Sequence, residues 1–384
     1  MTRVLVAMSG GVDSSVAAAL LLEQGYEVIG AWMRMHDVAD FASPHKKACC
    51  SLDAAEDARR VAGQLGIPFT ILNMEREYAD RVLDPFLAEY QAGCTPSPCV
   101  DCNTYVKFGA LLARAVRTLG CDAIATGHYA RIEALEDLAA SGGRRYRLLR
   151  GRDASKDQTY FLYALRQEQL ARTLFPLGGF TKAEVRALAS ERGLATAGKA
   201  ESQELCFVPG GDYRVVLEER AGWHETPGPL LDADGTLLGE HRGIAAYTVG
   251  QRQGLGVALG ERRYVARLDP VANLVQLGRR DDLLRGSFGV AAMSFIAGGP
   301  PNDGVFEATV QIRHGAAAVP CMVRPPDASR AGAAEGLAGA TDGWTVTTDT
   351  PVWAPAPGQA GVFYSGDEVI GGGRIEGGAR IELG

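Results

Sequence analysis

The sequence has no apolar run near the roughly 20 residues that a membrane-spanning helix needs. Nor does a secretory leader pattern precede its first apolar segment. Its eight cysteines, in 384 residues, are too few and too irregularly spaced for a secreted disulfide scaffold. We therefore expect a cytoplasmic protein with no membrane partner. In such a protein cysteines are more often catalytic, metal-binding or simply buried.

The chain also lacks an excess of positive charge. Its formal net charge is −7, from 39 Lys and Arg against 46 Asp and Glu. This balance argues against coating nucleic acid through bulk charge, and we expect no DNA partner. A local basic face stays open as an alternative, because five arginines and a lysine fall within residues 144–156. A solvated charged hairpin explains the same stretch equally well. Length and composition indicate a globular protein of two or three domains.

The segment Met8-Ser9-Gly10-Gly11-Val12-Asp13-Ser14-Ser15 lies between two apolar stretches. Residues 4–7 predict a buried strand, and the Ala/Leu-rich residues 16–22 predict a helix. Backbone N–H groups at such a strand-to-helix turn, together with the helix dipole, bind anions. The segment contains neither the Gly-Lys-Ser/Thr of a P-loop nor a three-glycine dinucleotide fingerprint. It suits the pyrophosphate that leaves when ATP adenylates a substrate, and a tight turn without a ligand is the alternative.

Strand and helix patterns alternate over residues 1 to about 130. The predicted strands are 4–7, 28–33, 69–72 and 123–126, and the predicted helices are 14–23, 52–65, 79–90 and 108–119, followed by 167–174 and 182–192. The alternation predicts a parallel sheet covered on both faces, with ligands at the carboxyl ends of its strands. Met33 ends the second strand, so it either borders the ligand or belongs to the core. His36, His45, Cys49 and Cys50 fit no standard zinc spacing, and we predict a mobile loop there rather than a metal site.

Two cysteine segments carry further chemistry. In residues 93–103, two prolines predict an extended loop that leads into Cys99-x-x-Cys102. Such a pair permits a disulfide, half a metal site or a thiolate of lowered pKa, and a buried structural pair is the alternative. Cys206 lies in an irregular segment bounded by Gly and Pro. Alone it would be expected to be inert, but with the earlier pair a joint redox role is worth considering.

Other polar residues follow predicted strands or precede predicted helices. Gly127 and His128 come after the strand 123–126, where a glycine lets a ligand approach the backbone. His128 is equally consistent with a hydrogen-bonded core histidine. Asp157 precedes a segment that is rich in aromatics and reads as a helix, so it is a candidate helix cap.

The pattern changes from about residue 212 to short strands and turns, which predict a small second domain and then a barrel. Residues 325–343 are rich in Ala and Gly and predict a flexible insertion. We predict an α/β protein with three domains: a doubly wound parallel-sheet domain (1–205), a small central domain (206–283) and a C-terminal β-barrel-like domain (284–384).

These motifs, in this order, resemble the bacterial tRNA-specific 2-thiouridylases, a family of the N-type ATP pyrophosphatase superfamily. The matching pieces are SGGVDSS, TPSPCVDCN, TGHYAR, KDQTYFLY, the cysteine at 206, TVGQRQGLG and the C-terminal Pro-Gly-Gln at 357–359. SGGVDSS alone resembles only the superfamily. The two separated cysteine sites, KDQTYFLY and the β tail make the resemblance specific, and it runs nearly from end to end.

The resemblance implies that ATP adenylates the C2 oxygen of the wobble uridine in tRNAs for Lys, Glu and Gln, with release of pyrophosphate. A persulfide sulfur then displaces AMP. By similarity, Cys206 carries the persulfide and Cys102 is the second catalytic cysteine, and a transient Cys102–Cys206 disulfide closes the cycle. The implied partners are tRNA and a sulfur donor protein, either a cysteine desulfurase or a sulfur relay carrier. The target base must be extruded to reach both ATP and sulfur.

The resemblance also assigns binding residues. ATP is assigned to Ala7, Met8, Ser9, Gly10, Gly11, Val12, Asp13, Ser14, Met33 and Gly127. Asp13 is assigned either to Mg²⁺ that accompanies ATP or to the architecture of the loop, and no other metal is expected. The target base is assigned to Ser97, Pro98 and Cys99. The tRNA is assigned to His128, Lys156, Asp157, Gln158, Arg313, His314 and Gln359.

The sequence departs from many relatives at Cys99, where an aspartate is common. Cys99, Cys102 and Cys206 are therefore also candidates to hold a [4Fe–4S] cluster, which would change the sulfur carrier without changing the product. We favour the persulfide route, with Cys99 as a substitution in the base loop. A different class of function, a PP-loop synthetase acting on a small molecule, would need neither essential cysteines nor an RNA-binding tail.

Overall fold

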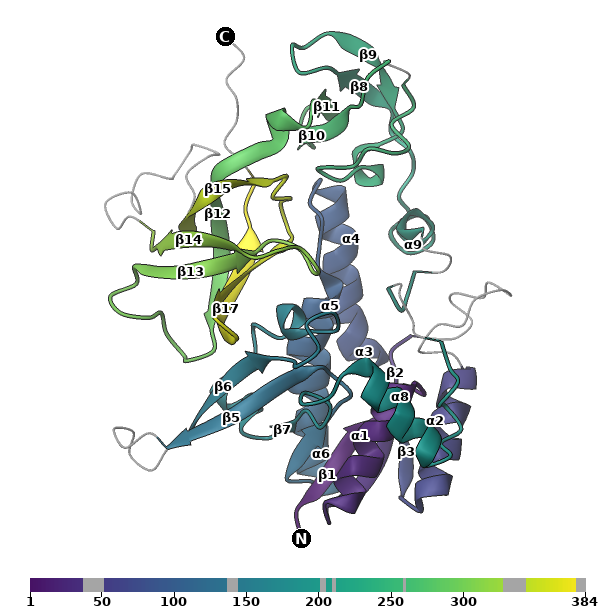
Figure 1. Cartoon of the computed structure of the whole chain (residues 1–384). Coiled ribbons are helices and arrows are strands. Elements are labelled where there is room, and N and C mark those ends of the chain that lie inside the picture. Colours follow the sequence, from purple (N-terminus) through teal and green to yellow (C-terminus); the bar gives the residue numbers. More distant parts are fainter. Residues whose placement is uncertain are drawn as a thin grey trace.

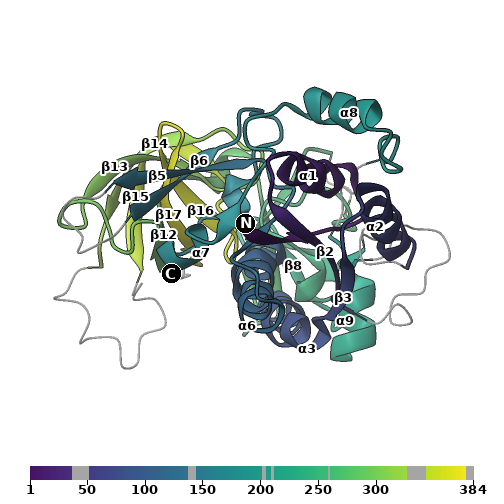
Figure 2. The same cartoon turned by 90° about the horizontal axis from the view of Figure 1, so that it is seen from below.

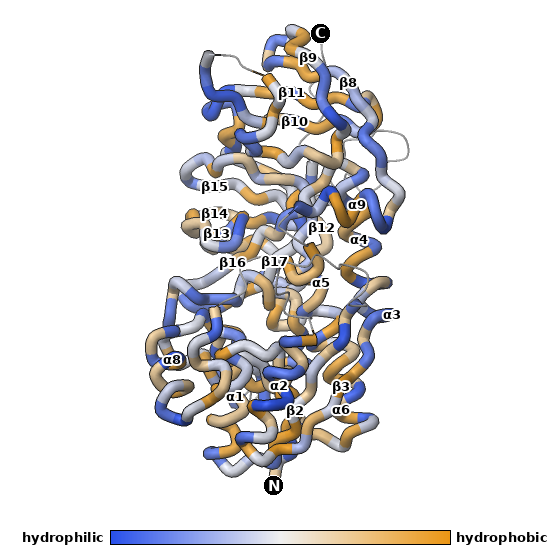
Figure 3. The backbone as a smooth tube through the Cα atoms, turned by 90° about the vertical axis from the view of Figure 1, so that its right-hand side faces the viewer, coloured by the Kyte–Doolittle hydropathy of each residue, from blue (hydrophilic) through white to orange (hydrophobic). Residues whose placement is uncertain are grey.

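The computed structural model describes residues 1–36, 52–136, 144–200, 205–208, 212–257, 260–326 and 343–377. Three units follow one another along the molecule: a parallel-sheet unit that holds the N-terminus, a barrel, and a small β unit at the end opposite the N-terminus (Figures 1 and 3). His45, Cys49 and Cys50 lie outside the described residues, as do residues 327–342 of the insertion predicted over 325–343.

The N-terminal unit is built on a five-stranded sheet in the order β3-β2-β1-β4-β7, with all paired strands parallel. The strands are β1 (Arg3–Ala7), β2 (Glu27–Arg34), β3 (Phe69–Asn73), β4 (Ala123–Ala125) and β7 (Thr173–Leu174). The central strand β1 is apolar throughout its buried length, as expected for a strand covered on both faces. The predicted doubly wound parallel sheet is therefore confirmed.

Helices cover both faces of this sheet (Figure 2). On one face lie α1 (Val12–Glu23), α2 (Leu52–Leu65) and α8 (Lys182–Glu191). On the other lie two long rods, each of which contains a π-helical segment. The first rod consists of α3 (Glu75–Tyr78), η2 (Ala79–Leu83) and α4 (Asp84–Gln91), and the second of α5 (Pro98–Asp101), η3 (Cys102–Leu111) and α6 (Leu112–Leu119).

Three local expectations were wrong. Pro98 begins helix α5 instead of extending the loop, because a proline at the first helical position has a suitable φ and needs no N–H partner. The helix predicted over 167–174 is the short α7 (Gln167–Leu170), and the chain then joins the sheet as β7. The helix expected after Asp157 is a single 3₁₀ turn, η4 (Thr159–Phe161).

The C-terminal unit is a closed antiparallel barrel of six strands, in the order β12-β15-β14-β13-β16-β17, which the pairing of β12 with β17 closes. Its strands are β12 (Leu284–Phe295), β13 (Phe306–Gln311), β14 (Val319–Arg324), β15 (Trp344–Trp353), β16 (Ala360–Ser365) and β17 (Glu368–Ile375). A hairpin from the N-terminal half, β5 (Ala130–Glu136) and β6 (Arg144–Arg150), extends this sheet through the register Glu368–Leu149. Segments from the N-terminal half and from the last third of the chain therefore share one sheet.

The central unit begins with α9 (Tyr213–Ala221) and contains a four-stranded sheet in the order β10-β11-β8-β9. These strands are β8 (Gly228–Leu231), β9 (Leu237–His241), β10 (Tyr264–Asp269) and β11 (Leu274–Gly278), with 3₁₀ turns η6 (Ile244–Ala246) and η7 (Asp281–Leu283) beside them. Among the described residues, no helix combines the length and the apolar composition of a membrane span.

Candidate nucleotide and thiol site

The glycine-rich turn after β1 leaves its backbone close to neighbouring main chain. Gly10 has φ +71°, and a Cβ at this position would lie 2.2 Å from the Ala54 carbonyl oxygen. Gly11 is the N-cap of α1, and no side chain there bonds to the first turn. The amino end of a 12-residue helix thus stands behind a turn that only glycine can form. This geometry fits a phosphate group.

Gly127 lies against the same helix end. A Cβ at Gly127 would stand 2.8 Å from the Ser14 amide nitrogen and 2.9 Å from Asp13. Ser14 Oγ accepts a hydrogen bond from the Ser9 amide at 3.2 Å and donates to the Gly11 carbonyl at 3.2 Å. The predicted ATP residues of the loop and Gly127 therefore form one continuous cradle. Met33, by contrast, is half-buried near the end of the adjacent strand β2.

Two lysines that the sequence reasoning missed supply the cations that the turn itself lacks. Lys182 Nζ lies 2.8 Å and 2.7 Å from the two carboxylate oxygens of Asp13. Lys199 Nζ donates to the Gly10 carbonyl at 2.8 Å and to Asp57 Oδ2 at 2.7 Å. The capping box of Thr181 and Glu184 marks Lys182 as the first residue of α8. That signal is visible in the sequence, but it does not reveal that α8 packs beside α1.

Asp13, the residue predicted to lie near Mg²⁺, is fully engaged in this structure. Besides the two contacts with Lys182, its Oδ1 accepts a hydrogen bond from the Tyr129 hydroxyl at 2.8 Å. A carboxylate held in this way is not arranged as a metal ligand. Within the described ranges, no group of three His, Cys, Asp or Glu side chains is placed to hold a metal ion.

Three free thiols lie close enough together for the charge of one to raise the pKa of another: Cys99, Cys102 and Cys206. Burial raises the pKa of Cys99 to about 11, with a smaller contribution from Cys206. Burial likewise raises the pKa of Cys102 to about 12, and the positive charge of Lys107 opposes this rise. Lys107 is a third lysine that the sequence reasoning missed. The structure thus brings together the three cysteines that the sequence singled out.

Cys206 is held on the first helical rod. The hydroxyl of Tyr78 lies 3.4 Å from Cys206 Sγ, at hydrogen-bonding distance for sulfur. The next residue, Phe207, is buried with its ring edge-on to Tyr78 and to Phe86. These aromatic contacts fix a short segment that has no regular secondary structure of its own.

The loop before α5 (residues 93–97), which we call the base loop after its predicted role, is anchored to the barrel. The Thr95 amide donates to the Pro357 carbonyl at 2.7 Å, and Gln359 Nε2 donates to the carbonyls of Thr95 and Pro96 at 3.1 Å and 3.4 Å. Gly358 has φ +87°, and a Cβ there would lie 3.0 Å from the Thr95 carbonyl oxygen. Gln359, predicted to contact tRNA, therefore holds the loop that leads through Ser97 into Pro98, the first residue of α5, and both of these residues are buried.

Of the remaining residues predicted to contact tRNA, some line a cavity and others do not. Asp157 is buried and accepts hydrogen bonds from Arg150 Nη1 at 2.8 Å and from the Thr159 hydroxyl at 2.7 Å. His314 approaches the Asp157 carbonyl oxygen at 3.3 Å. Asp157 and His314 line a cavity of about 640 Å³ between the β5–β6 hairpin and the barrel, together with Arg131, Arg150, Arg152 and Ser155 among others.

Gln158 and Arg313 lie beside this cavity and do not line it. Gln158 Oε1 accepts a hydrogen bond from the Tyr129 amide at 3.0 Å, and Lys156 is half-buried in the same turn. Arg313 Nη2 donates to the Ala354 carbonyl at 2.6 Å, and burial lowers the pKa of its guanidinium.

His128 is part of the core beneath the site. It is buried, its Nδ1 lies 2.6 Å from the Thr126 hydroxyl, and its ring packs near Phe108 and Phe175. Burial lowers its pKa well below the ordinary value, so the imidazole is neutral at physiological pH. This environment matches the alternative of a hydrogen-bonded core histidine.

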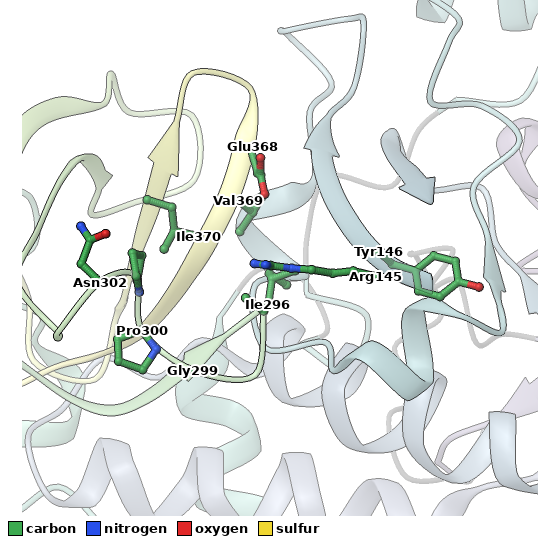
Figure 4. Close-up of a pocket in the computed structure, with 11 residues that line it drawn as sticks. Arg145, Tyr146, Ile296, Gly299, Pro300, Asn302, Glu368, Val369 and Ile370 are labelled. Atoms are coloured by element: carbon green, nitrogen blue, oxygen red, sulfur yellow. The ribbon is translucent and has the colours of Figure 1, made fainter. Parts of the chain in front are cut away.

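A cavity of about 390 Å³ lies where the hairpin meets the barrel, between Arg145 and Tyr146 of β6 and Glu368–Ile370 of β17 (Figure 4). None of the sequence-predicted site residues lines it. The arginines of β6 are also not a uniform basic surface: Arg147 pairs with Glu133 and Glu368, and Arg150 pairs with Asp157. The sequence was consistent with a basic face or with a charged hairpin, and the hairpin has features of both: it is rich in arginine, and some of its arginines form ion pairs.

Comparison with known proteins covers almost the whole chain. The family described as tRNA methyl transferase HUP domain matches residues 2–210, that described as tRNA methyl transferase PRC-barrel domain matches 216–279, and that described as aminomethyltransferase beta-barrel domain matches 285–375. Among curated relatives, the tRNA-specific 2-thiouridylase MnmA of Roseiflexus sp. (strain RS-1) is 48% identical over 98% of this chain and 99% of its own length. The proteins of that name from Chloroflexus aurantiacus (46% identical, 100% of each chain) and Moorella thermoacetica (48% identical, 98% of this chain and 100% of that one) match equally fully.

Proposed function

This chain belongs to the tRNA-specific 2-thiouridylase family of PP-loop enzymes, and we propose that it replaces the C2 oxygen of the wobble uridine in tRNAs for Lys, Glu and Gln by sulfur. What supports this proposal most is that Cys99, Cys102 and Cys206 lie near one another in the unit that also holds the glycine-rich cradle after β1. An ATP pyrophosphatase that works on a small molecule has no need of such thiols. Although two of the matching families are described by the words tRNA methyl transferase, it is the transfer of sulfur that calls for such thiols.

In the first step, the carbonyl oxygen of the uridine attacks the α-phosphorus of ATP and pyrophosphate leaves. The cradle from Ser9 to Ser14 binds the departing phosphates through backbone N–H groups and the amino end of α1. Lys182 and Lys199 stand close enough to the turn to neutralise charge as it develops. Asp13 then acts as the residue that positions Lys182. Adenylation makes the C2 oxygen a good leaving group.

In the second step, the terminal sulfur of a Cys206 persulfide attacks C2 and AMP leaves, so that uridine and Cys206 are joined through a disulfide. Cys102 loses its proton to solvent, and its thiolate attacks Cys206 Sγ. The electrons of the broken S–S bond stay with the sulfur on C2, which becomes the 2-thiouridine. A Cys102–Cys206 disulfide remains, and a two-electron reductant and a new sulfur donor must restore the persulfide. The donor is a cysteine desulfurase or a relay carrier, and the setting is cytoplasmic.

The test is an anaerobic thiolation assay on unmodified tRNA with ATP and a persulfide donor. We expect 2-thiouridine from the wild-type protein, none from Cys102→Ser or Cys206→Ser, and normal yield from the control Cys121→Ser, which removes a buried thiol outside the site. Pyrophosphate release should persist in both catalytic variants. Pyrophosphate release without tRNA, and without any need for the thiols, would instead support a small-molecule synthetase.

Iron and sulfide analysis of the same preparation decides between the two sulfur carriers. Activity without iron supports the persulfide route and makes Cys99 dispensable. About four irons per chain, with activity lost on Cys99→Ala, would replace that route by a cluster on the three cysteines.

A further inference from the structure

The helix that begins at Cys102 is a π-helix over ten residues, Cys102–Leu111. π-Helical segments are rare and are frequently found at functional sites. Two neighbours suit this register. A Cβ on Gly109 would lie 3.1 Å from the Thr104 carbonyl oxygen, the group that its amide faces in an i→i+5 pattern. Gln169 Nε2 donates to the carbonyls of Thr104 and Phe108 at 3.5 Å and 2.8 Å.

The π-helical register changes which side chains share a face. In an α-helix with 3.6 residues per turn, residues five apart point about 140° away from each other. In a π-helix, the i→i+5 bond closes a wider turn, so such residues lie on the same side of the helix. Lys107 is five residues after Cys102, so the π turn brings the lysine to the side of the rod that carries the thiol. Lys107 is half-buried there, and its charge lowers the pKa of Cys99, Cys102 and His128.

We propose that Lys107 is a positioning residue for sulfur transfer, which the π-helix places beside Cys102 so that its ammonium stabilises the thiolate that attacks Cys206. The inference rests on the proposed function for the identity of that step. Burial makes the Cys102 thiol a weak acid, and an attacking thiol must lose its proton. An ammonium on the next turn of the same helix favours the charged form of the thiol without being consumed. Gly109 and Gln169 serve the step indirectly, by favouring the register.

The experiment measures the rate of Cys102 alkylation by iodoacetamide against pH in the full-length protein, with mass spectrometry to separate Cys102 from Cys99. Lys107→Met removes the charge and keeps the length of the side chain. We expect its profile to move to higher pH and its rate at pH 8 to fall about tenfold, the change in thiolate fraction for one pKa unit. Lys107→Arg should restore the rate. Arg117→Met, an exposed residue on α6 of the same rod, is the matched control and should leave the profile unchanged.

A second variant separates charge from register. Gly109→Ala keeps Lys107 but crowds the Thr104 carbonyl, and it should shift the Cys102 profile in the same direction as Lys107→Met. The inference would be overturned if the Lys107→Met protein unfolds at the wild-type temperature and its Cys102 is alkylated with the same pH profile as in the wild type. Alkylation needs neither ATP nor tRNA, so it remains informative if the wild-type protein fails to thiolate tRNA, a result that would overturn only the proposed function.

Discussion

Arg374 of β17 joins the barrel to both helical rods, and its removal should be costly. Its Nη1 lies 2.8 Å from a Glu89 carboxylate oxygen on α4, and its Nη2 lies 2.8 Å from each oxygen of Asp101 on α5. The Asp101 side chain is 9% exposed, and those of Arg374 and Glu89 are 30% and 25% exposed. Asp101 immediately precedes Cys102, so this ion pair also fixes the start of the thiol-bearing helix.

The free energy of unfolding that is lost on removing Arg374 lies between two limits. Breaking a buried pair by removing one partner costs about 3–5 kcal/mol, because the other charge stays buried. An exposed pair contributes only about 0–1 kcal/mol. Because Asp101 is buried and the other two side chains are partly exposed, we expect Arg374→Met to lose about 2–3 kcal/mol at pH 7.

The loss should also depend on pH. Burial raises the pKa of Asp101 and of Glu89, and Arg374 opposes both rises. Without Arg374 the folded-state pKa of each carboxyl rises further above its unfolded value. Such a group destabilises the folded protein when it is charged. The stability deficit of Arg374→Met relative to wild type is therefore largest at neutral pH. It shrinks as the pH falls through the raised values, since protonation removes the unpaired buried charge.

Urea unfolding of wild type, Arg374→Met and the exposed barrel control Arg324→Met, at pH 7 and pH 5, measures this effect. The control should stay within about 0.5 kcal/mol of wild type. Adding Asp101→Asn to Arg374→Met should recover part of the loss at pH 7, because it removes one of the unpaired charges. An Arg374→Met deficit that is the same at both pH values, or below that of the control, would refute the reasoning.

Three further predictions concern the site. Lys182→Met should slow tRNA-dependent pyrophosphate release about 10- to 100-fold, because a hydrogen bond to a charged group contributes about 1.5–3 kcal/mol; tRNA binding, measured by filter retention, should be unchanged. Gly127→Ala pushes a Cβ to 2.8 Å from the Ser14 amide nitrogen. It should raise the KM for ATP or lower kcat by about 10- to 100-fold, as a displacement of roughly 1 Å does, whereas Gly198→Ala, whose Cβ meets nothing within 4 Å, should match wild type in the same assay. Gly358→Ala crowds the Thr95 carbonyl and should reduce thiolation more than pyrophosphate release, so equal losses in the two assays would contradict the anchoring role of this turn.

Local patterns were enough to predict the parallel sheet and its first helices, because buried strands, an Ala/Leu-rich helix and an amphipathic helix each leave a strong local signal. The helix over Leu52–Leu65 has the predicted bounds, and β1 differs from its prediction by one residue. Local patterns failed where tertiary contacts decide the structure. Thr173 and Leu174 continue a helical pattern, yet they pair with β4 as the edge of the sheet. The hairpin β5–β6 was read as a charged surface, and its pairing with the barrel has no local signal.

The site shows the same division. Spacing and resemblance pointed to the glycines and to Cys99 and Cys102, because these residues belong to short motifs. They also pointed to Cys206, because of its place in the order of the motifs. They did not identify Lys182, Lys199 or Lys107, which lie in ordinary helical or turn sequence. Lys182 and Lys199 reach Asp13 and Gly10 from more than 150 positions away in the chain, at separations of 169 and 189. The position of Lys107 depends on a π-helical register that no propensity scale distinguishes from an α-helix.

The barrel also helps to position the helix that carries the thiols. Gln359 and Gly358 hold the loop that precedes Cys99, and Arg374 holds Asp101, so the position of the thiol-bearing helix depends on the docking of the C-terminal unit. If tRNA draws the Gln359 amide to itself, as the family resemblance implies, the carbonyls of Thr95 and Pro96 lose their partner. Binding of tRNA and the position of the base loop are then thermodynamically linked. Gln359→Leu tests this: it should loosen the loop in the free protein, seen as faster amide exchange at Cys94 and Thr95, and unchanged exchange there would mean that the two carbonyl contacts do not restrain the loop.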